Sequence, residues 1–223
     1  MKARAARRGR AGATREQILT AAERLFAEHG VLAVSNRQVS EAAGQGNNAA
    51  VGYHFGAKAD LVRAIVRKHA DALEQARRDL VERAGDTAGV REWVTCLVRP
   101  ITEHLDALGS PTWFARFAAQ VLTDPALRPI MAEEALTSPA LQRIIDGLNR
   151  CLPGLPDEVR AERHAMASLL LVHTCAERER ALAEGLPTSR STWHDAGTGL
   201  IDAITGLWLA PVTAGPHVRE EGP

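Results

Sequence analysis

The sequence predicts an all-α fold of about nine helices, arranged as a three-helix N-terminal domain and a larger C-terminal helical domain. Three observations predict it. Apolar residues recur at helical spacing along most of the chain, and the period-2 alternation typical of strands is scarce. Glycine and proline mark the breaks between the helical segments. The chain is 45% hydrophobic, which is enough apolar material for a real core.

The first helix is predicted to begin at Thr14 and to end at Gly30. Ile18 and Phe26 fall on one face and are expected in the core. Gly30 suits the C-terminal cap, because glycine tolerates the left-handed backbone that ends many helices. The basic residues 1–13 come before this helix, and we expect them to form a disordered arm.

Two short helices are predicted between residues 35 and 55. Ser35 and Gln38 have the spacing of a capping box, which starts the first of them. Gly44-Gln45-Gly46 forms the turn, and the second short helix ends at Phe55. This is the helix-turn-helix pattern, in which the second helix enters the major groove of DNA. The spacing alone is weak evidence, because other pairs of short helices show it too.

A long helix is predicted after Gly56 and ends at the Gly85 to Gly89 break. Beyond it, three capping residues followed by proline predict further helix starts. These pairs are Ser110-Pro111, Asp124-Pro125 and Ser138-Pro139. The last two helices are predicted over residues 157–184 and 191–209. We therefore expect a helix-turn-helix domain over 14–60, a connecting helix over 61–85, a helical body over 86–211 and a polar tail over 212–223.

The formal net charge of zero conceals an asymmetry between the two parts of the chain. Residues 1–85 carry 15 Lys and Arg against 9 Asp and Glu, whereas residues 86–223 carry 12 against 18. A basic head on an acidic body is what a polyanion-binding protein needs, although a charged run is more often only a solvated surface.

Several function classes are disfavoured by absent motifs. Three widely spaced cysteines argue against a disulfide framework and a paired-cysteine metal site, and they fit a reducing compartment. The N-terminus has no secretory pattern, and no apolar run is long enough to span a bilayer. HExxH, GxSxG, Walker and GxGxxG motifs are missing. We therefore expect a cytoplasmic protein with no membrane, metal, cofactor or catalytic residues; a small helical enzyme is the competing interpretation.

The N-terminal domain resembles that of the TetR/AcrR transcriptional regulators over about residues 14–66. The motifs that carry the resemblance are Thr14-Arg15-Glu16-Gln17-Ile18-Leu19, Leu25-Phe26-Ala27-Glu28-His29-Gly30, Glu41-Ala42-Ala43-Gly44 and Tyr53-His54-Phe55-Gly56-Ala57-Lys58. This sequence departs from the family pattern in two places. The stretch between Gly44 and Tyr53 is one residue longer, and Ala57 stands where the family has a helix-capping serine.

The resemblance implies binding to double-stranded operator DNA through the residues around the two short helices. The candidate DNA-binding residues are Ser35, Arg37, Gln45, Asn47, Asn48, Tyr53, His54 and Lys58. Asn and Gln can pair with adenine at the start of the recognition helix, but they are also ordinary turn residues. We expect phosphates near Ser35, Arg37, Tyr53 and Lys58. The alternatives are a plain cap for Ser35, a plain surface residue for Arg37 and a core side chain for Tyr53.

The basic arm admits two interpretations. Its cations Lys2, Arg4, Arg7, Arg8 and Arg10 either extend into solvent or cross the adjacent minor groove, as homeodomain arms do.

For the body, the resemblance implies a ligand-binding and dimerisation domain. The candidate lining residues of a cavity for a small apolar or amphipathic effector are Trp93, Cys96, Leu97, Trp113, Phe117, Met166 and His173. Plain core packing is the alternative for each. In the last helix an apolar stripe (Trp193, Leu200, Ile204, Leu207 and Trp208) suits either the core of one subunit or a homodimer interface. The predicted function is a ligand-responsive repressor, with a regulator or activator that has no effector as the alternative.

Overall fold

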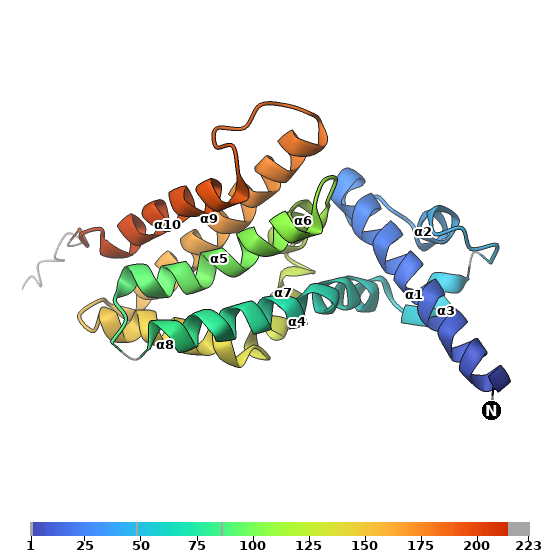
Figure 1. Cartoon of the computed structure of the whole chain (residues 1–223), viewed down its shortest axis with the longest axis horizontal. Coiled ribbons are helices and arrows are strands. Elements are labelled where there is room, and N and C mark those ends of the chain that lie inside the picture. Colours follow the sequence, from blue (N-terminus) through green and yellow to red (C-terminus); the bar gives the residue numbers. More distant parts are fainter. Residues whose placement is uncertain (1, 48, 86, 214–223) are drawn as a thin grey trace, which may run out of the picture.

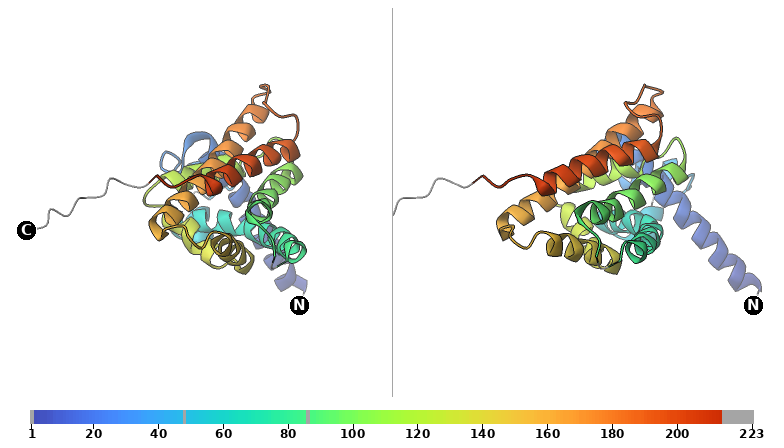
Figure 2. Two further views of the ribbon diagram at one scale, coloured as in Figure 1. Left: turned by 90° about the vertical axis from the view of Figure 1, so that its left-hand side faces the viewer. Right: turned by 60° about the vertical axis from the view of Figure 1, so that its left-hand side comes forward.

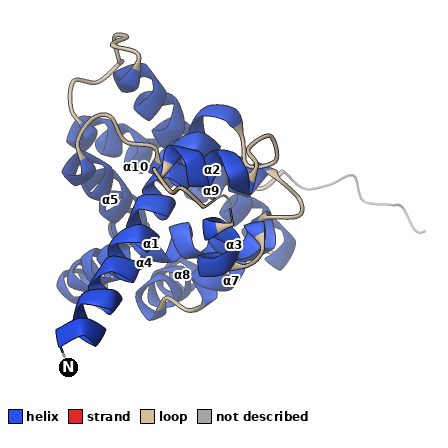
Figure 3. Ribbon diagram, turned by 90° about the vertical axis from the view of Figure 1, so that its right-hand side faces the viewer, coloured by secondary structure: helices blue, strands red, loops and turns tan. Residues whose placement is uncertain are grey.

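The computed structural model describes residues 2–47, 49–85 and 87–213, with side chains from Gly12 onward. This part of the chain contains ten α-helices and no strand (Figures 1 and 3), which confirms the all-α prediction. The helices are α1 (Lys2–His29), α2 (Asn36–Ala42), α3 (Ala50–Phe55), α4 (Lys58–Ala84), α5 (Val90–Leu108), α6 (Phe114–Thr123), α7 (Arg128–Leu136), α8 (Pro139–Cys151), α9 (Asp157–Ala183) and α10 (Trp193–Leu209).

Helix α1 begins at Lys2, so the structure does not have the disordered arm expected over residues 1–13. The reason is local, since alanine and arginine fill most of this segment and both are strong helix formers. The other end agrees with the sequence. Gly30 follows the helix with φ +87°, in the left-handed region that glycine occupies without strain.

Three helix starts were predicted from a capping residue followed by proline, and one of them is correct. Ser138 caps α8, accepting a hydrogen bond from Leu141 N at 3.2 Å, with proline at the next position. Asp124 instead forms a tight turn by accepting from Ala126 N at 2.8 Å, and α7 begins only at Arg128. Helix α6 begins at Phe114 rather than at Pro111. A capping residue before proline therefore marks a turn here as readily as a helix.

The head consists of α1, α2, α3 and the first turns of α4, and it lies at one end of the molecule (Figure 1). Its core is made by Ile18, Phe26, Val39, Val51 and Leu61, all fully buried. Ile18 and Phe26 were expected in the core from their helical spacing, and Val39, Val51 and Leu61 add one buried side chain each from α2, α3 and α4. The head thus buries its own small core and leaves α2 and α3 at the surface (Figure 3).

The body is a bundle in which α10 packs along α5, and α5 packs on α4 and α8 (Figure 2). Two glycines allow the close approaches. A Cβ atom at Gly147 of α8 would lie 2.2 Å from the Trp93 ring, and one at Gly197 of α10 would lie 2.8 Å from the Thr102 hydroxyl. Any larger residue at Gly147 would therefore push α8 away from α5.

Head and body meet where α1 packs on α6 and α4. Phe26 of α1 and Phe117 of α6 stack with ring centroids 6.3 Å apart, and both are fully buried. This buried aromatic contact joins the head to the body.

Candidate nucleic-acid interface

The capping box predicted at the start of α2 is present. The Ser35 hydroxyl accepts from Gln38 N at 3.2 Å, and the Gln38 side chain accepts from Ser35 N at 2.8 Å. These bonds satisfy two backbone donors that the first turn of a helix leaves open. Ser35 itself is exposed, so its hydroxyl lies beside the positive end of α2, where a phosphate is stabilised.

Arg37 is exposed in the first turn of α2. Its Nε donates to Glu41 Oε1 at 2.8 Å, and this bond and the Glu41 charge raise the pKa of the guanidinium. The guanidinium has further N–H donors besides Nε. Arg37 can therefore contact a phosphate while Glu41 fixes its orientation.

The turn residues lie before the recognition helix, not within it as expected, because α3 begins only at Ala50. Gln45 Nε2 donates to Gln17 Oε1 at 3.2 Å and to Ala43 O at 3.0 Å, so this amide ties the turn to α1. Asn47 Oδ1 accepts from Ala49 N at 2.9 Å, the role of a turn residue. Asn48 lies outside the described residues. No spacing rule identifies Gln17 as the partner of Gln45, since 28 residues separate them.

Tyr53 is the most exposed large hydrophobic side chain among the described residues of the head, at 85%. It projects from the end of α3 next to the half-buried His54, with the two rings edge to face at 5.1 Å. A tyrosine that buries almost nothing contributes little to the core, so its aromatic hydroxyl is available to a phosphate.

Lys58 differs from the prediction. Its Nζ donates to Val31 O at 3.0 Å and to Val34 O at 2.6 Å. The ammonium thus holds the loop between α1 and α2 against the start of α4. The prediction for Lys58 was a phosphate contact, and it did not include this role. Ala57 provides no side-chain cap for α4; Asp60 accepts from Ala57 N at 3.2 Å instead.

The fold and this surface define a helix-turn-helix protein with an all-helical body. The family model described as "Bacterial regulatory proteins, tetR family" matches residues 18–65, and the model described as "Tetracyclin repressor-like, C-terminal domain" matches residues 95–206. The chain therefore belongs to the TetR family, and it is a DNA-binding transcriptional regulator.

Solved structures of similar proteins include three bacterial regulators, each with a TM-score of 0.47. A TetR-family regulator from Streptomyces coelicolor A3 is 22% identical, over 88% of this chain and 95% of its own. The TetR-family transcriptional regulator PfmR from Thermus thermophilus is 20% identical, over 84% and 96%. A transcriptional regulator from Rhodococcus sp. Rha1 is 20% identical, over 87% and 95%. No curated protein matches the chain.

The candidate effector-binding residues do not gather around one cavity in the described part of the chain. Trp93, Cys96 and Phe117 are fully packed in the core; Phe117 faces Phe26 of the head, and burial raises the pKa of the Cys96 thiol to about 11. Leu97 and Trp113 are half-buried against the core. These five side chains pack in or against the core of this structure, and their contact with an effector stays a prediction.

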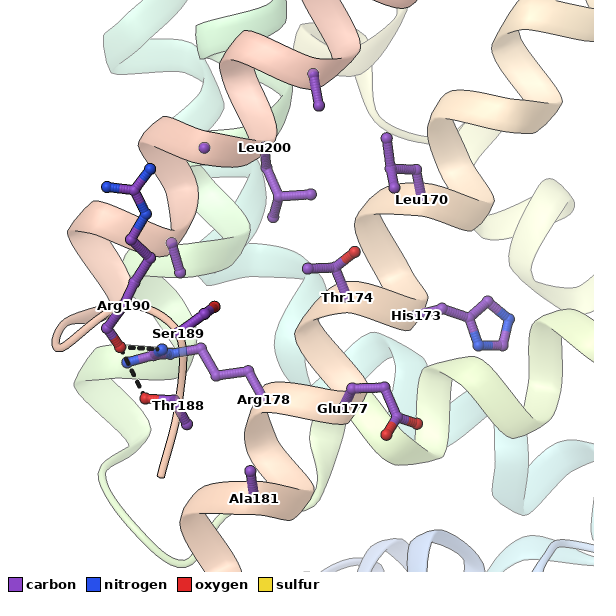
Figure 4. Close-up of a pocket in the computed structure, with 13 residues that line it drawn as sticks. Leu170, His173, Thr174, Glu177, Arg178, Ala181, Thr188, Ser189, Arg190 and Leu200 are labelled. Carbon is purple, nitrogen blue, oxygen red and sulfur yellow. Dashed lines mark hydrogen bonds between the residues drawn. The ribbon is translucent and has the colours of Figure 1, made fainter. Parts of the chain in front are cut away.

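The remaining two candidates lie on α9. Met166 is 44% exposed, and His173 is half-buried at a pocket of about 640 Å³ between α9, α10 and the loop that joins them (Figure 4). Leu170 and Leu200 lie on the two helices, and Arg178 Nη1 donates to Arg190 O of the loop at 2.7 Å. The pocket is an open groove on the outer face of these helices.

None of the described helices combines the length and the apolar character that crossing a bilayer requires.

Proposed function

We propose that this protein is a homodimeric repressor that binds a palindromic operator and is released by a small apolar or amphipathic effector. The observation that carries the proposal is that family models match both the head and the body, and the body model is tetracyclin repressor-like. The exposed side chains of Ser35, Arg37 and Tyr53, which belong to the two short helices and the cap of α2, are available for phosphate contacts. No catalytic step is part of the proposal.

The dimer interface is proposed on α9. Met166, Leu169 and Leu170 are 44%, 45% and 38% exposed, and with His173 they fall on one face at helical spacing. Such an exposed apolar stripe marks an interaction surface, and the groove beside it offers room for a partner's side chains. The stripe of α10 has a different role, since Trp193, Leu200, Ile204 and Trp208 are buried within the chain.

The coupling from body to head follows from the packing. Helix α4 begins in the head and runs into the body without a break, and α6 touches α1 through Phe117 and Phe26. In a dimer the two recognition helices must lie about 34 Å apart to enter successive major grooves. An effector that shifts α4 or α6 moves the head and changes that spacing.

The experiment is a thermal-shift screen of hydrophobic small molecules, followed by calorimetry of a molecule that raises the unfolding temperature. We expect operator DNA to weaken its binding by roughly 5- to 150-fold, because linkage makes the coupling reciprocal. Equal affinities with and without operator would mean that the body does not control the head.

A regulator without an effector is the second candidate, and a specific observation favours it. Trp93 and Phe117 were expected to line the effector cavity, but both side chains are fully buried in the core. A screen in which no molecule stabilises the protein, while operator binding is intact, would support this candidate.

A further inference from the structure

A chain of hydrogen-bonded titratable groups crosses the junction between head and body. Glu23 of α1 accepts from Lys68 Nζ at 2.9 Å through Oε2, and its Oε1 lies 3.2 Å from His69 Nε2. His69 Nδ1 lies 2.8 Å from His104 Nε2 of α5. Glu23 and His69 are buried, and His104 is half-buried. Three helices, α1, α4 and α5, are thus joined by polar contacts in an apolar surrounding.

An aromatic ring of α6 closes the group on its remaining side. Phe114 stacks on His69 with ring centroids 3.9 Å apart, and it meets His104 edge to face at 5.8 Å. Next along α6, Arg116 Nε pairs with Glu179 of α9 at 3.1 Å, so the nearest charges on that side neutralise each other. The charged and titratable groups that face His104 are therefore His69, Glu23 and Lys68.

The Glu23 carboxylate determines which atom donates in each of these hydrogen bonds. Burial raises the pKa of Glu23, but the bonds and charges of His69 and Lys68 outweigh it and hold the pKa below its ordinary value. An ionised carboxylate only accepts, so a neutral His69 ring donates from Nε2 and its Nδ1 is left as an acceptor. His104 then donates from Nε2. The negative charge of Glu23 and the positive charge of Lys68 offset each other.

Two protonated rings cannot keep this arrangement. His69 Nδ1–H and His104 Nε2–H would be two donors facing each other across 2.8 Å, with no acceptor between them. The buried group would also carry an uncompensated positive charge. The contact between α4 and α5 must then open.

We propose that Glu23, His69 and His104 form an acid-sensitive joint that holds the DNA-binding head on the body, so that acidification opens the joint and weakens DNA binding. The proposal rests on the proposed function for its DNA readout. It assigns regulation by protons to contacts that lie away from both the DNA-facing surface and the groove on α9.

The pH range follows from His104. Burial is the main cause that lowers its pKa from 6.5 to about 4. The closed joint binds fewer protons than the open one, so it is fully stabilised above about pH 6.5 and loses that stability as the pH falls toward 4. Between pH 7.5 and pH 5.5 the open form gains about tenfold over the closed form.

The test uses His104→Gln in the full-length chain. The glutamine amide can donate to His69 as the ring does, but it takes up no proton. Operator affinity is measured by fluorescence anisotropy at pH 7.5, 6.5 and 5.5 and at constant ionic strength. The matched control is His164→Gln. His164 is a half-buried histidine of α9 whose pKa burial and Arg160 lower, and it packs on Trp208 far from the junction.

Wild type and His164→Gln should bind more weakly at pH 5.5 than at pH 7.5, by up to about tenfold. His104→Gln should bind like wild type at pH 7.5 and lose most of the pH response. Parallel pH profiles for all three proteins would overturn the joint.

A DNA-free measurement keeps the proposal testable if the variant misfolds or if no operator is bound. In ¹⁵N spectra of the wild-type imidazole rings, His104 should stay neutral, with the proton on Nε2, down to about pH 5. A His104 that titrates at its ordinary pKa would refute the joint. Failure to bind any duplex at pH 7.5 would instead refute the proposed function.

Discussion

At the scale of single residues, several cations of the described chain are fixed by backbone carbonyls. Lys58 donates to Val31 O and Val34 O, and Arg163 of α9 donates to Trp208 O at 2.7 Å, near the C-terminal end of α10. Such bonds satisfy carbonyls that helix ends and loops leave open. Sequence reasoning predicted the capping box of Ser35, whose partner is three residues away, but could not predict the partners of Lys58, which lie 24 and 27 residues away.

Arg77 differs from these cations, and it gives a prediction for stability. Its Nε is buried without a hydrogen-bond partner, and burial lowers the pKa of its guanidinium, although Glu74 opposes the shift. The Glu74 carboxylate is bound to the start of α8, through the Ser138 hydroxyl and Ala140 N. Arg77→Met should therefore be neutral or stabilise the fold by about 1 kcal/mol in thermal unfolding, because it removes a poorly compensated buried charge.

The control for that prediction is Arg78→Met. Arg78 is exposed and lies 3.9 Å from Glu74, and surface pairs of this kind contribute little. Loss of about 1 kcal/mol or more on replacing Arg77 alone would show that its guanidinium has an anionic partner in solution.

At the scale of helices, the sequence predicted where most elements lie better than which neighbour each one contacts. The apolar stripe of the last helix is real, but it is buried within the same chain, where Trp193 lies under Arg178 of α9 and Trp208 meets His164 of α9. Arg99 Nη1 of α5 also holds α10 by donating to His194 O at 2.6 Å. Periodicity identifies an apolar face and carries no information on which surface covers it. For the same reason, periodicity did not show that the apolar stripe of α9 is exposed, since Leu169 and Leu170 look like core residues in the sequence.

That distinction leads to a prediction for assembly. Glu at both Leu169 and Leu170 should give a folded monomer in sedimentation velocity, because two charges would be buried in the proposed interface and the chain's own core would be untouched. Leu136→Glu on α7, at a side chain that is 70% exposed, should leave the dimer intact. A dimer that survives the double change would place the interface on other helices. Ile204 is unsuitable for this test, because it is fully buried within one chain.

At the scale of the whole molecule, the basic head and the acidic body of the sequence became two ends of one structure (Figure 1). The all-α class, the break after Ala84 and the helix-turn-helix were predictable because each depends on local spacing. The head–body junction was not, because Glu23, His69 and His104 are separated by 46 and 35 residues. Only the packing of α1, α4 and α5 brings them together.

The central claim, that two copies present their recognition helices to one operator, is tested most directly by selecting duplexes from a random pool with the wild-type protein. We expect a palindrome whose half-site centres are about one helical turn, or a multiple of it, apart, bound by two chains with an affinity that falls steeply as salt rises. Tyr53→Ala should weaken binding to every selected sequence alike, because a phosphate contact carries no sequence information. Selection of no motif, or of a single half-site bound by one chain, would contradict the account.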